Sequence, residues 1–138
     1  MSAQGDLFAR FGEVWVTGKV DVLDELLPAD IAYHLPPFPD MDLEALKQFI
    51  LGFHQAFPDF DLTIQEEIVD GDASAHRWSC RGTFSGVSSL LPSAPTGQVA
   101  EATGTHITHW RDGRPTEMWH NGDWLGWLQK SGVVPPLG

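Results

Sequence analysis

Histidine and tryptophan are both more frequent in this chain than in most chains of 138 residues, with six of each. An imidazole changes charge near neutral pH and can take up or release a proton there. At least half of the tryptophans are expected in the core, and the others can supply the apolar walls of a small-molecule pocket. The composition therefore predicts acid–base chemistry on a small apolar compound, by some of the histidines at positions 34, 54, 76, 106, 109 and 120.

His106 and His120 are the first candidates for this chemistry. They lie in two strand-like runs, 98–110 and 115–121, which are separated by a short turn at 111–114. Counting back from the turn places the two histidines roughly opposite each other. Opposed residues on one face of a strand pair have Cβ atoms about 5 Å apart, so both rings can reach one ligand. We therefore predict that His106 and His120 are catalytic.

Side chains alternate along a strand, and this alternation extends the predicted pocket. Thr108 shares the face of His106, whereas Met118 and Thr116 share the face of His120. In the run 73–84, the face that suits a pocket wall carries His76, Trp78, Cys80 and Phe84. Thr108, Met118 and these four residues are predicted to bind the substrate.

Three candidates lie outside these runs. His34 precedes a proline-rich segment and is expected at the mouth of the pocket. Tyr33 is the only tyrosine and could donate a phenol hydrogen, although alternation turns it away from His34. Asp123 is a candidate catalytic acid, but its position just before a helical run also suits an N-cap.

The remaining histidines point to structural or surface roles. His54 belongs to a predicted helix, and His109 faces away from His106 on its strand. Because His106 and His109 face opposite ways, they cannot both bind one metal ion, and no metal site is predicted. Cys80 has no neighbour that would activate its thiol, so it also suits the role of a small apolar filler.

The order of the predicted elements indicates an α+β fold. Three helical runs come early, four long strand-like runs follow, and a short helix ends the pattern. Antiparallel strands with helices on one face are typical of α+β domains, and a strongly curved sheet would leave a cone with an open end. The predicted helices span residues 4–18, 21–27, 42–57 and 124–131, and the strands span 31–35, 60–69, 73–84, 98–110 and 115–121, with a loop or lid at 85–97.

Length and charge limit the classes of function. A chain of 138 residues suits one domain over residues 1–138. The net charge of −11 argues against nucleic acids and anionic membranes as partners. No apolar run is long enough to span a membrane, and no secretory signal is visible. With a single cysteine, the chain is expected to be cytoplasmic.

Several short motifs follow one another along the chain. They are Phe57-Pro58-Asp59-Phe60, Arg77-Trp78, Arg81-Gly82-Thr83, Pro95-Thr96-Gly97, Asp112-Gly113-Arg114-Pro115-Thr116-Glu117-Met118-Trp119 and Asp123-Trp124-Leu125-Gly126-Trp127-Leu128-Gln129. In this order they resemble landmarks of the SnoaL-like polyketide cyclase family. The likeness covers roughly residues 43–133, and the order of the helices extends it to the whole chain.

This resemblance implies a cone-shaped α+β barrel of the NTF2-like or ketosteroid isomerase-like kind. It also implies a curved sheet around the N-terminal helices, an apolar pocket without metal or cofactor, and frequent homodimers. Cyclases of the family close a ring by aldol condensation, using an acidic residue on the last long strand with a histidine nearby. The histidine position matches His106, whereas the acidic position falls on His120.

Three functions are compared with these observations. The first is a cofactor-independent cyclase, isomerase or dehydratase that acts on a polyketide-like carbonyl compound through its pocket histidines. The second is a binding or dimerisation module that keeps the cone without chemistry, which the replaced acidic residue favours. Epoxide opening, which related hydrolases perform with two carboxylates and an arginine, ranks third because the inward faces lack such a set.

Overall fold

The computed structural model describes residues 2–136, and its elements follow the order expected from the sequence. The bounds agree with the expected ones within one or two residues, except that the second helix begins as a 3-10 turn. In chain order the elements are α1 (Ala3–Thr17), η1 (Val20–Val22), α2 (Leu23–Leu26), β1 (Ala32–His34), α3 (Leu43–Ala56), β2 (Asp61–Asp70), β3 (Ala73–Thr83), β4 (Val99–Arg111), β5 (Arg114–Gly122) and α4 (Trp124–Lys130).

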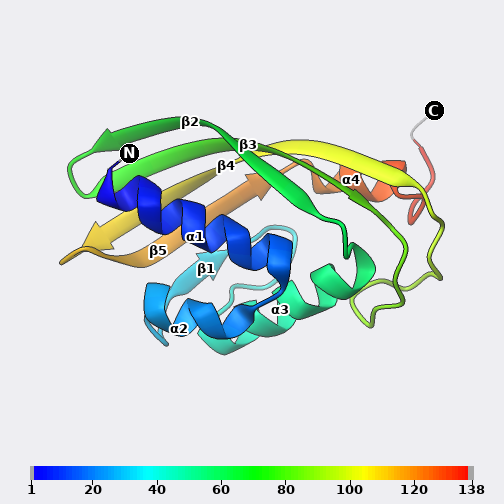
Figure 1. Ribbon diagram of the computed structural model, residues 1–138, viewed down its shortest axis with the longest axis horizontal. Coiled ribbons are helices and arrows are strands. Elements are labelled where there is room, and N and C mark those ends of the chain that lie inside the picture. Colours follow the sequence, from blue (N-terminus) through cyan, green and yellow to red (C-terminus); the bar gives the residue numbers. More distant parts are fainter. Residues whose placement is uncertain (1, 137–138) are drawn as a thin grey trace.

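The five strands form one open sheet in the order β1-β5-β4-β3-β2. Strand β1 runs parallel to β5, and the other neighbouring pairs are antiparallel. Figure 1 shows α1 and α3 against the same side of the curved sheet, with α4 following the end of β5. This arrangement confirms the predicted α+β fold with a curved, mostly antiparallel sheet around N-terminal helices.

Capping side chains and glycines set the ends of the main elements. Ser2 and Asp42 accept hydrogen bonds from backbone N–H groups in the first turns of α1 and α3. Gly18 ends α1 in the left-handed region, with φ of 74°. The β4–β5 hairpin turns at Asp112 and Gly113, which both have positive φ, as a two-residue turn between twisted strands requires. The sequence thus fixes the register that aligns the strands of the candidate site.

The core lies between the sheet and its helices. The apolar stripe of α1 (Phe8, Phe11, Trp15) and that of α3 (Leu46, Ile50) are buried. Along β4 the buried and exposed side chains alternate, so that one face meets these helices and the other faces solvent. No helix within residues 2–136 has the length and the apolar character needed to cross a membrane.

Candidate functional site

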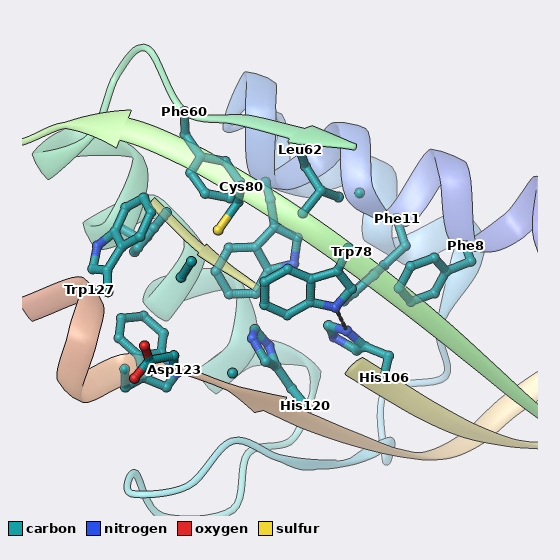
Figure 2. A pocket seen from close by; sticks show the side chains of 16 residues that line it. Phe8, Phe11, Phe60, Leu62, Trp78, Cys80, His106, His120, Asp123 and Trp127 are labelled. Carbon is teal, nitrogen blue, oxygen red and sulfur yellow. Dashed lines mark hydrogen bonds between the residues drawn. The ribbon is translucent and has the colours of Figure 1, made fainter. Parts of the chain in front are cut away.

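The candidate site is a small apolar cavity between α1, the middle of the sheet and α4. The cavity has a volume of about 50 Å³, and aromatic side chains make most of its wall. Figure 2 shows His120 and Asp123 on one side of it, opposite Cys80 and Phe60. The lining residues are Phe8, Phe11, Gly12, Trp15, Phe53, Phe60, Leu62, Trp78, Cys80, Ala102, His106, His120, Gly122, Asp123, Trp124 and Trp127.

His106 and His120 face each other across neighbouring strands. They are direct partners in the β4–β5 register, and their ring centroids lie 4.3 Å apart. The exposed fractions are only 4% for His106 and 6% for His120. The two imidazoles therefore sit side by side in a water-poor interior, within the reach that strand counting predicts.

A chain of hydrogen bonds joins these rings to two aromatic residues. The indole Nε1–H of Trp78 donates to Nδ1 of His106 over 2.8 Å, as the dashed line in Figure 2 marks. The hydroxyl of Tyr33 lies 2.8 Å from Nε2 of His106 and 2.8 Å from Nδ1 of His120. Both nitrogens of His106 are thus occupied by protein groups.

His120 keeps one ring nitrogen free for a ligand. Within residues 2–136, its Nε2 makes no hydrogen bond to the protein. This nitrogen lies beside Gly122, since a Cβ added at Gly122 would be 3.8 Å from it and 3.1 Å from the Trp78 ring. Gly122 and His120 both line the cavity, and the absence of a side chain at Gly122 lets the Trp78 ring lie close to the backbone there.

Burial keeps the groups of this chain neutral. Burial lowers the pKa of His106 well below 6.5, with further lowering from the neighbouring His120 and His76. Burial also lowers the pKa of His120 to about 3. The pKa of Tyr33 is raised well above 10 by burial, so the side chain stays a phenol. Near neutral pH each imidazole therefore carries a single proton.

Asp123 combines a capping contact with a place at the pocket wall. Its Oδ1 accepts the N–H of Gly126 over 2.9 Å, so the residue is the N-cap of α4. A Cβ at Gly126 would overlap Oδ2 of the same carboxylate. Glycine at 126 therefore lets the carboxylate fold back over the start of α4. The capping role that its position before a helical run predicts is present, and the catalytic role of Asp123 stays a prediction.

Among the residues predicted to bind substrate, Trp78 and Cys80 line the cavity. Burial raises the pKa of the Cys80 thiol to about 12, so that it stays protonated. Tyr33 was expected to meet the ligand as a phenol donor. It is fully buried instead, and its hydroxyl is directed at the two histidines.

Thr108, Met118 and Phe84 were expected on the pocket wall but lie in the core. Thr108 and Met118 are paired two residues closer to the β4–β5 turn than the histidines, where both side chains are fully covered. Phe84 is also fully buried and packs against Phe57. Alternation gave all three the correct inward face, but it carries no information about depth along the cone.

His76 and His34 also lie away from the cavity. His76 is buried against the ring of Phe8, and its Nε2 lies 3.1 Å from a carboxylate oxygen of Glu67. His34 was expected at the pocket mouth. It faces the outer side of the sheet, with ring nitrogens 2.8 Å from Asp40 and 2.6 Å from Glu117. These carboxylates raise the pKa of His34, through hydrogen bonds first and charge second.

Much of the pocket wall was not singled out from the sequence. Phe8, Phe11 and Trp15 come from α1, while Trp124 and Trp127 come from α4. The helical spacing of the α1 residues marks them as buried but does not tell a core face from a pocket face. In the part of the chain that the structure describes, no three His, Cys, Asp or Glu side chains are grouped to hold a metal ion.

Comparisons with known proteins agree on one family and one fold. The model of the SnoaL-like polyketide cyclase family matches residues 6–130. IdmH from Streptomyces antibioticus, a candidate polyketide cyclase of known structure, is 30% identical, with 94% of this chain and 98% of that chain covered and a TM-score of 0.78. No curated protein matches the chain.

Two more distant structures support the fold alone. A candidate SnoaL-like polyketide cyclase from Jannaschia sp. CCS1 is 18% identical, with 96% of this chain and 94% of that chain covered and a TM-score of 0.82. A protein of ketosteroid isomerase-like fold from Catenulispora acidiphila is 15% identical, with 93% of both chains covered and a TM-score of 0.73. With the family model matching most of its length, the chain belongs to the SnoaL-like polyketide cyclase family.

Proposed function

We propose that the protein is a cofactor-independent enzyme that performs acid–base chemistry on a small, apolar carbonyl compound of polyketide type. The observation that carries this proposal is the free Nε2 of His120 beside an apolar cavity. A single polar atom among aromatic walls can orient an apolar ligand through one hydrogen bond. The family and the likeness to IdmH support the class of compound.

Proton removal next to a carbonyl group is the step that we assign to this site. Aldol ring closure, double-bond isomerisation and loss of water all begin with it, so cyclase, isomerase and lyase chemistry share the same first intermediate. His120 is the ring that meets the substrate, because both nitrogens of His106 are already bound. Asp123 supplies the only carboxylate among the lining residues of the described chain. His106 then acts as a positioning residue for its neighbour.

The test is hydrogen–deuterium exchange at the carbon next to the carbonyl of 1-indanone, followed by NMR in D₂O. We expect the protein to raise the exchange rate above that of buffer and the His120→Ala variant to lose this effect. A general acid or base typically contributes about 10²- to 10⁴-fold, which sets the expected loss. His109→Ala is the matched control, since His109 lies on the outer face of the sheet beside Trp119.

Tryptophan fluorescence of the same two proteins, measured with 1-indanone, separates catalysis from binding. If 1-indanone perturbs the tryptophan fluorescence of the wild type but not of His120→Ala, and no exchange above buffer occurs, the protein is a binding module. Absence of both effects rejects a carbonyl compound of this size as the ligand. Equal exchange in the wild type and in His120→Ala rejects the role of His120.

We further propose a cytoplasmic homodimer that associates through the outer face of the sheet. Ile107 is 44% exposed at the centre of this face, next to Trp119 in the β4–β5 register. An exposed branched apolar residue beside an aromatic one suits an interface core. Analytical ultracentrifugation of the wild type and of Ile107→Glu tests the assembly, and a wild type that sediments as a monomer at high micromolar concentration contradicts it.

A further inference from the structure

The hydrogen-bond chain through the two histidines has a direction that its first member imposes. An indole nitrogen always donates and never accepts. Because Trp78 donates to Nδ1 of His106, this nitrogen must hold a lone pair. A neutral His106 therefore carries its proton on Nε2, and that N–H donates to the hydroxyl oxygen of Tyr33.

The hydroxyl hydrogen of Tyr33 then has one acceptor left. The phenol is fully buried, and Nδ1 of His120 lies 2.8 Å from its oxygen. If Nδ1 of His120 carried the ring proton instead, two donors would meet at the Tyr33 oxygen and the hydroxyl hydrogen would be buried without a partner. Such an orphaned donor disfavours the second arrangement by a population ratio of roughly ten to one hundred.

We propose that Trp78 fixes the order Trp78→His106→Tyr33→His120, so that His120 offers the pocket an N–H donor and not a lone pair. The site is then built to bind a carbonyl oxygen that gains negative charge. What this donor does to a substrate rests on the proposed function, whereas the proton order itself does not. Trp78 and Tyr33 are positioning residues, since they act through the histidines.

This order assigns the two halves of the proposed step to different residues. The proton next to the carbonyl moves to the Asp123 carboxylate, and the electrons of the broken C–H bond form the carbon–carbon double bond of an enolate. The π electrons of the carbonyl move to its oxygen, which Nε2–H of His120 stabilises without losing its proton. Asp123 returns the proton to the product. A neutral imidazole acts in the same electrophilic manner in triosephosphate isomerase.

A reversed chain conflicts with the contacts of His106. A lone pair at Nε2 of His120 would require a proton at its Nδ1, which Tyr33 would have to accept while donating to Nε2 of His106. His106 already accepts from Trp78 at Nδ1, so it would need lone pairs on both nitrogens. That state is an imidazolate, which a buried, uncharged setting does not support. The low pKa values of both rings agree with two neutral imidazoles.

The decisive measurement is the tautomer of His120 in the full chain at pH 7, by two-bond ¹⁵N–¹H correlation NMR on protein with ¹⁵N-labelled histidine. We expect His106 and His120 both to be protonated at Nε2, with less than about one tenth of His120 in the other form. A proton on Nδ1 of His120, or on both of its nitrogens, overturns the proposal. No substrate or turnover is needed, so the result is independent of the proposed function.

Two variants test whether Trp78 sets the order. Trp78→Phe keeps an aromatic ring but removes the donor, so that His106 can take its proton on Nδ1. The reversed chain then no longer requires an imidazolate, and only the Nδ1–H of His106 is left without a partner. The minor tautomer of His120 is expected to rise at least fivefold in this variant, whereas Trp119→Phe on the outer face leaves it unchanged. An unchanged tautomer in a folded Trp78→Phe protein assigns the order to another group and overturns the role of Trp78.

Hydrogen bonding by the Nε2–H group of His120 can be detected with benzaldehyde labelled with ¹³C at the carbonyl. A hydrogen bond to this oxygen lowers the carbonyl stretching frequency, so infrared spectra should differ between the wild type and His120→Phe. Equal frequencies in the two proteins overturn the donation to a carbonyl. A frequency difference without catalysed exchange on 1-indanone keeps the proton order and rejects only the proposed enzyme.

Discussion

His106 and His120 have the same side chain, but their ring nitrogens contact different groups. Both nitrogens of His106 contact protein groups, whereas His120 has one nitrogen free at the cavity. The different contacts therefore give the two imidazole rings different roles. One ring holds the hydrogen-bond chain in place, and the other is open to a ligand.

The pKa of His120 predicts a specific loss of stability in acid. Its folded pKa of about 3 lies below the value near 6.5 of an unfolded chain, so the unfolded state binds the proton first as the pH falls. The contribution of the neutral His120 ring to the free energy of unfolding is complete above pH 6.5 and declines from there down to pH 3. At pH 5 this single ring costs about 2 kcal/mol of the free energy of unfolding.

Urea denaturation of the wild type and of His120→Gln at pH 7 and pH 5 measures this cost. The wild type should lose about 2 kcal/mol more than the variant between the two pH values. His34 acts with the opposite sign, because its raised pKa favours the folded state at low pH, but it is present in both proteins and cancels. Equal losses in the two proteins would contradict a neutral, buried His120.

For single residues, the sequence predicts which face of the sheet a side chain lies on better than it predicts what that side chain contacts. Strand alternation correctly placed His106, His120, Trp78 and Cys80 on the inner face. It also separated Tyr33 from His34, which face opposite sides of β1. The role of Tyr33 could not be predicted, because its contacts come from residues 73 and 87 positions away in the chain. A pattern within one strand holds no information about such distant partners.

Strand β4 holds Trp78 in place through a glycine. Gly104 lies directly opposite Trp78, and a Cβ there would overlap the indole ring and approach the Asn121 carbonyl oxygen to 2.7 Å. An aromatic ring can cover a cross-strand glycine in this way because no side chain competes for the space. Gly104 therefore determines where the first donor of the hydrogen-bond chain lies.

We predict that Gly104→Ala displaces Trp78 and weakens the whole sheet interior. Forcing one methyl group into this packed site should cost about 1–3 kcal/mol of unfolding free energy. Thermal melting measures the cost, and the indole N–H resonance of Trp78 should move as its bond to His106 breaks. Thr103→Ala, at the exposed neighbouring position, should change the stability by less than about 0.5 kcal/mol. An unshifted indole resonance in Gly104→Ala would contradict the tight contact.

Helix α4 allows capping and chemistry to be separated at Asp123. An asparagine there still offers an oxygen to the N–H of Gly126, whereas alanine offers none. Asp123→Asn should stay within a few tenths of a kcal/mol of the wild type, and Asp123→Ala should lose about 1 kcal/mol. Both variants lack the carboxylate, so both should lose exchange on 1-indanone by about 10²-fold or more. Normal exchange in Asp123→Asn would leave Asp123 as a cap alone.

The elements themselves were predictable because their signals are local. Helical spacing, capping residues and the Asp112–Gly113 turn lie within short windows of sequence, and the observed bounds follow them. Thr116 is an exception, because it was expected on the inner face with His120 and is exposed. A register shift follows His109, where Trp110 pairs with Pro115 and Thr116 is left over. A β-bulge of this kind turns one side chain to the opposite face of the sheet, and nothing in the sequence of the partner strand reveals it.

At the scale of the whole molecule, the cavity is smaller than its proposed ligand. Pockets for small molecules usually have volumes of about 300–1,000 Å³, well above the 50 Å³ found here. The resemblance to the family implied a pocket for a small apolar molecule. Aromatic residues of α1 and α4 fill most of that space, and the sequence could not show whether they belong to the pocket wall or to the core. Binding of a polyketide-sized molecule therefore requires the aromatic wall to move.

Cys80 reports such movement because it is the only cysteine and lines the cavity. With a pKa of about 12 in place of 9.0, its thiolate population at pH 8 is about a thousandfold below that of an ordinary thiol. We predict correspondingly slow modification by methyl methanethiosulfonate, followed by mass spectrometry. Trp124→Ala should widen the pocket and speed the reaction, whereas Leu125→Ala, at a neighbouring exposed position, should not. Fast labelling of the wild type would indicate a pocket that is open most of the time.

Tyr33 joins the two histidines from β1, a strand of only three residues at the edge of the sheet. Its backbone is held by the parallel pairing with β5 and by one bridge to Met41. The junction on which the proton order depends is thus attached to the shortest strand, while the rings that it connects are anchored in the long central ones. If this edge detached, each imidazole could exchange its proton with water independently, and the preference for one tautomer would disappear while the rest of the sheet stayed folded.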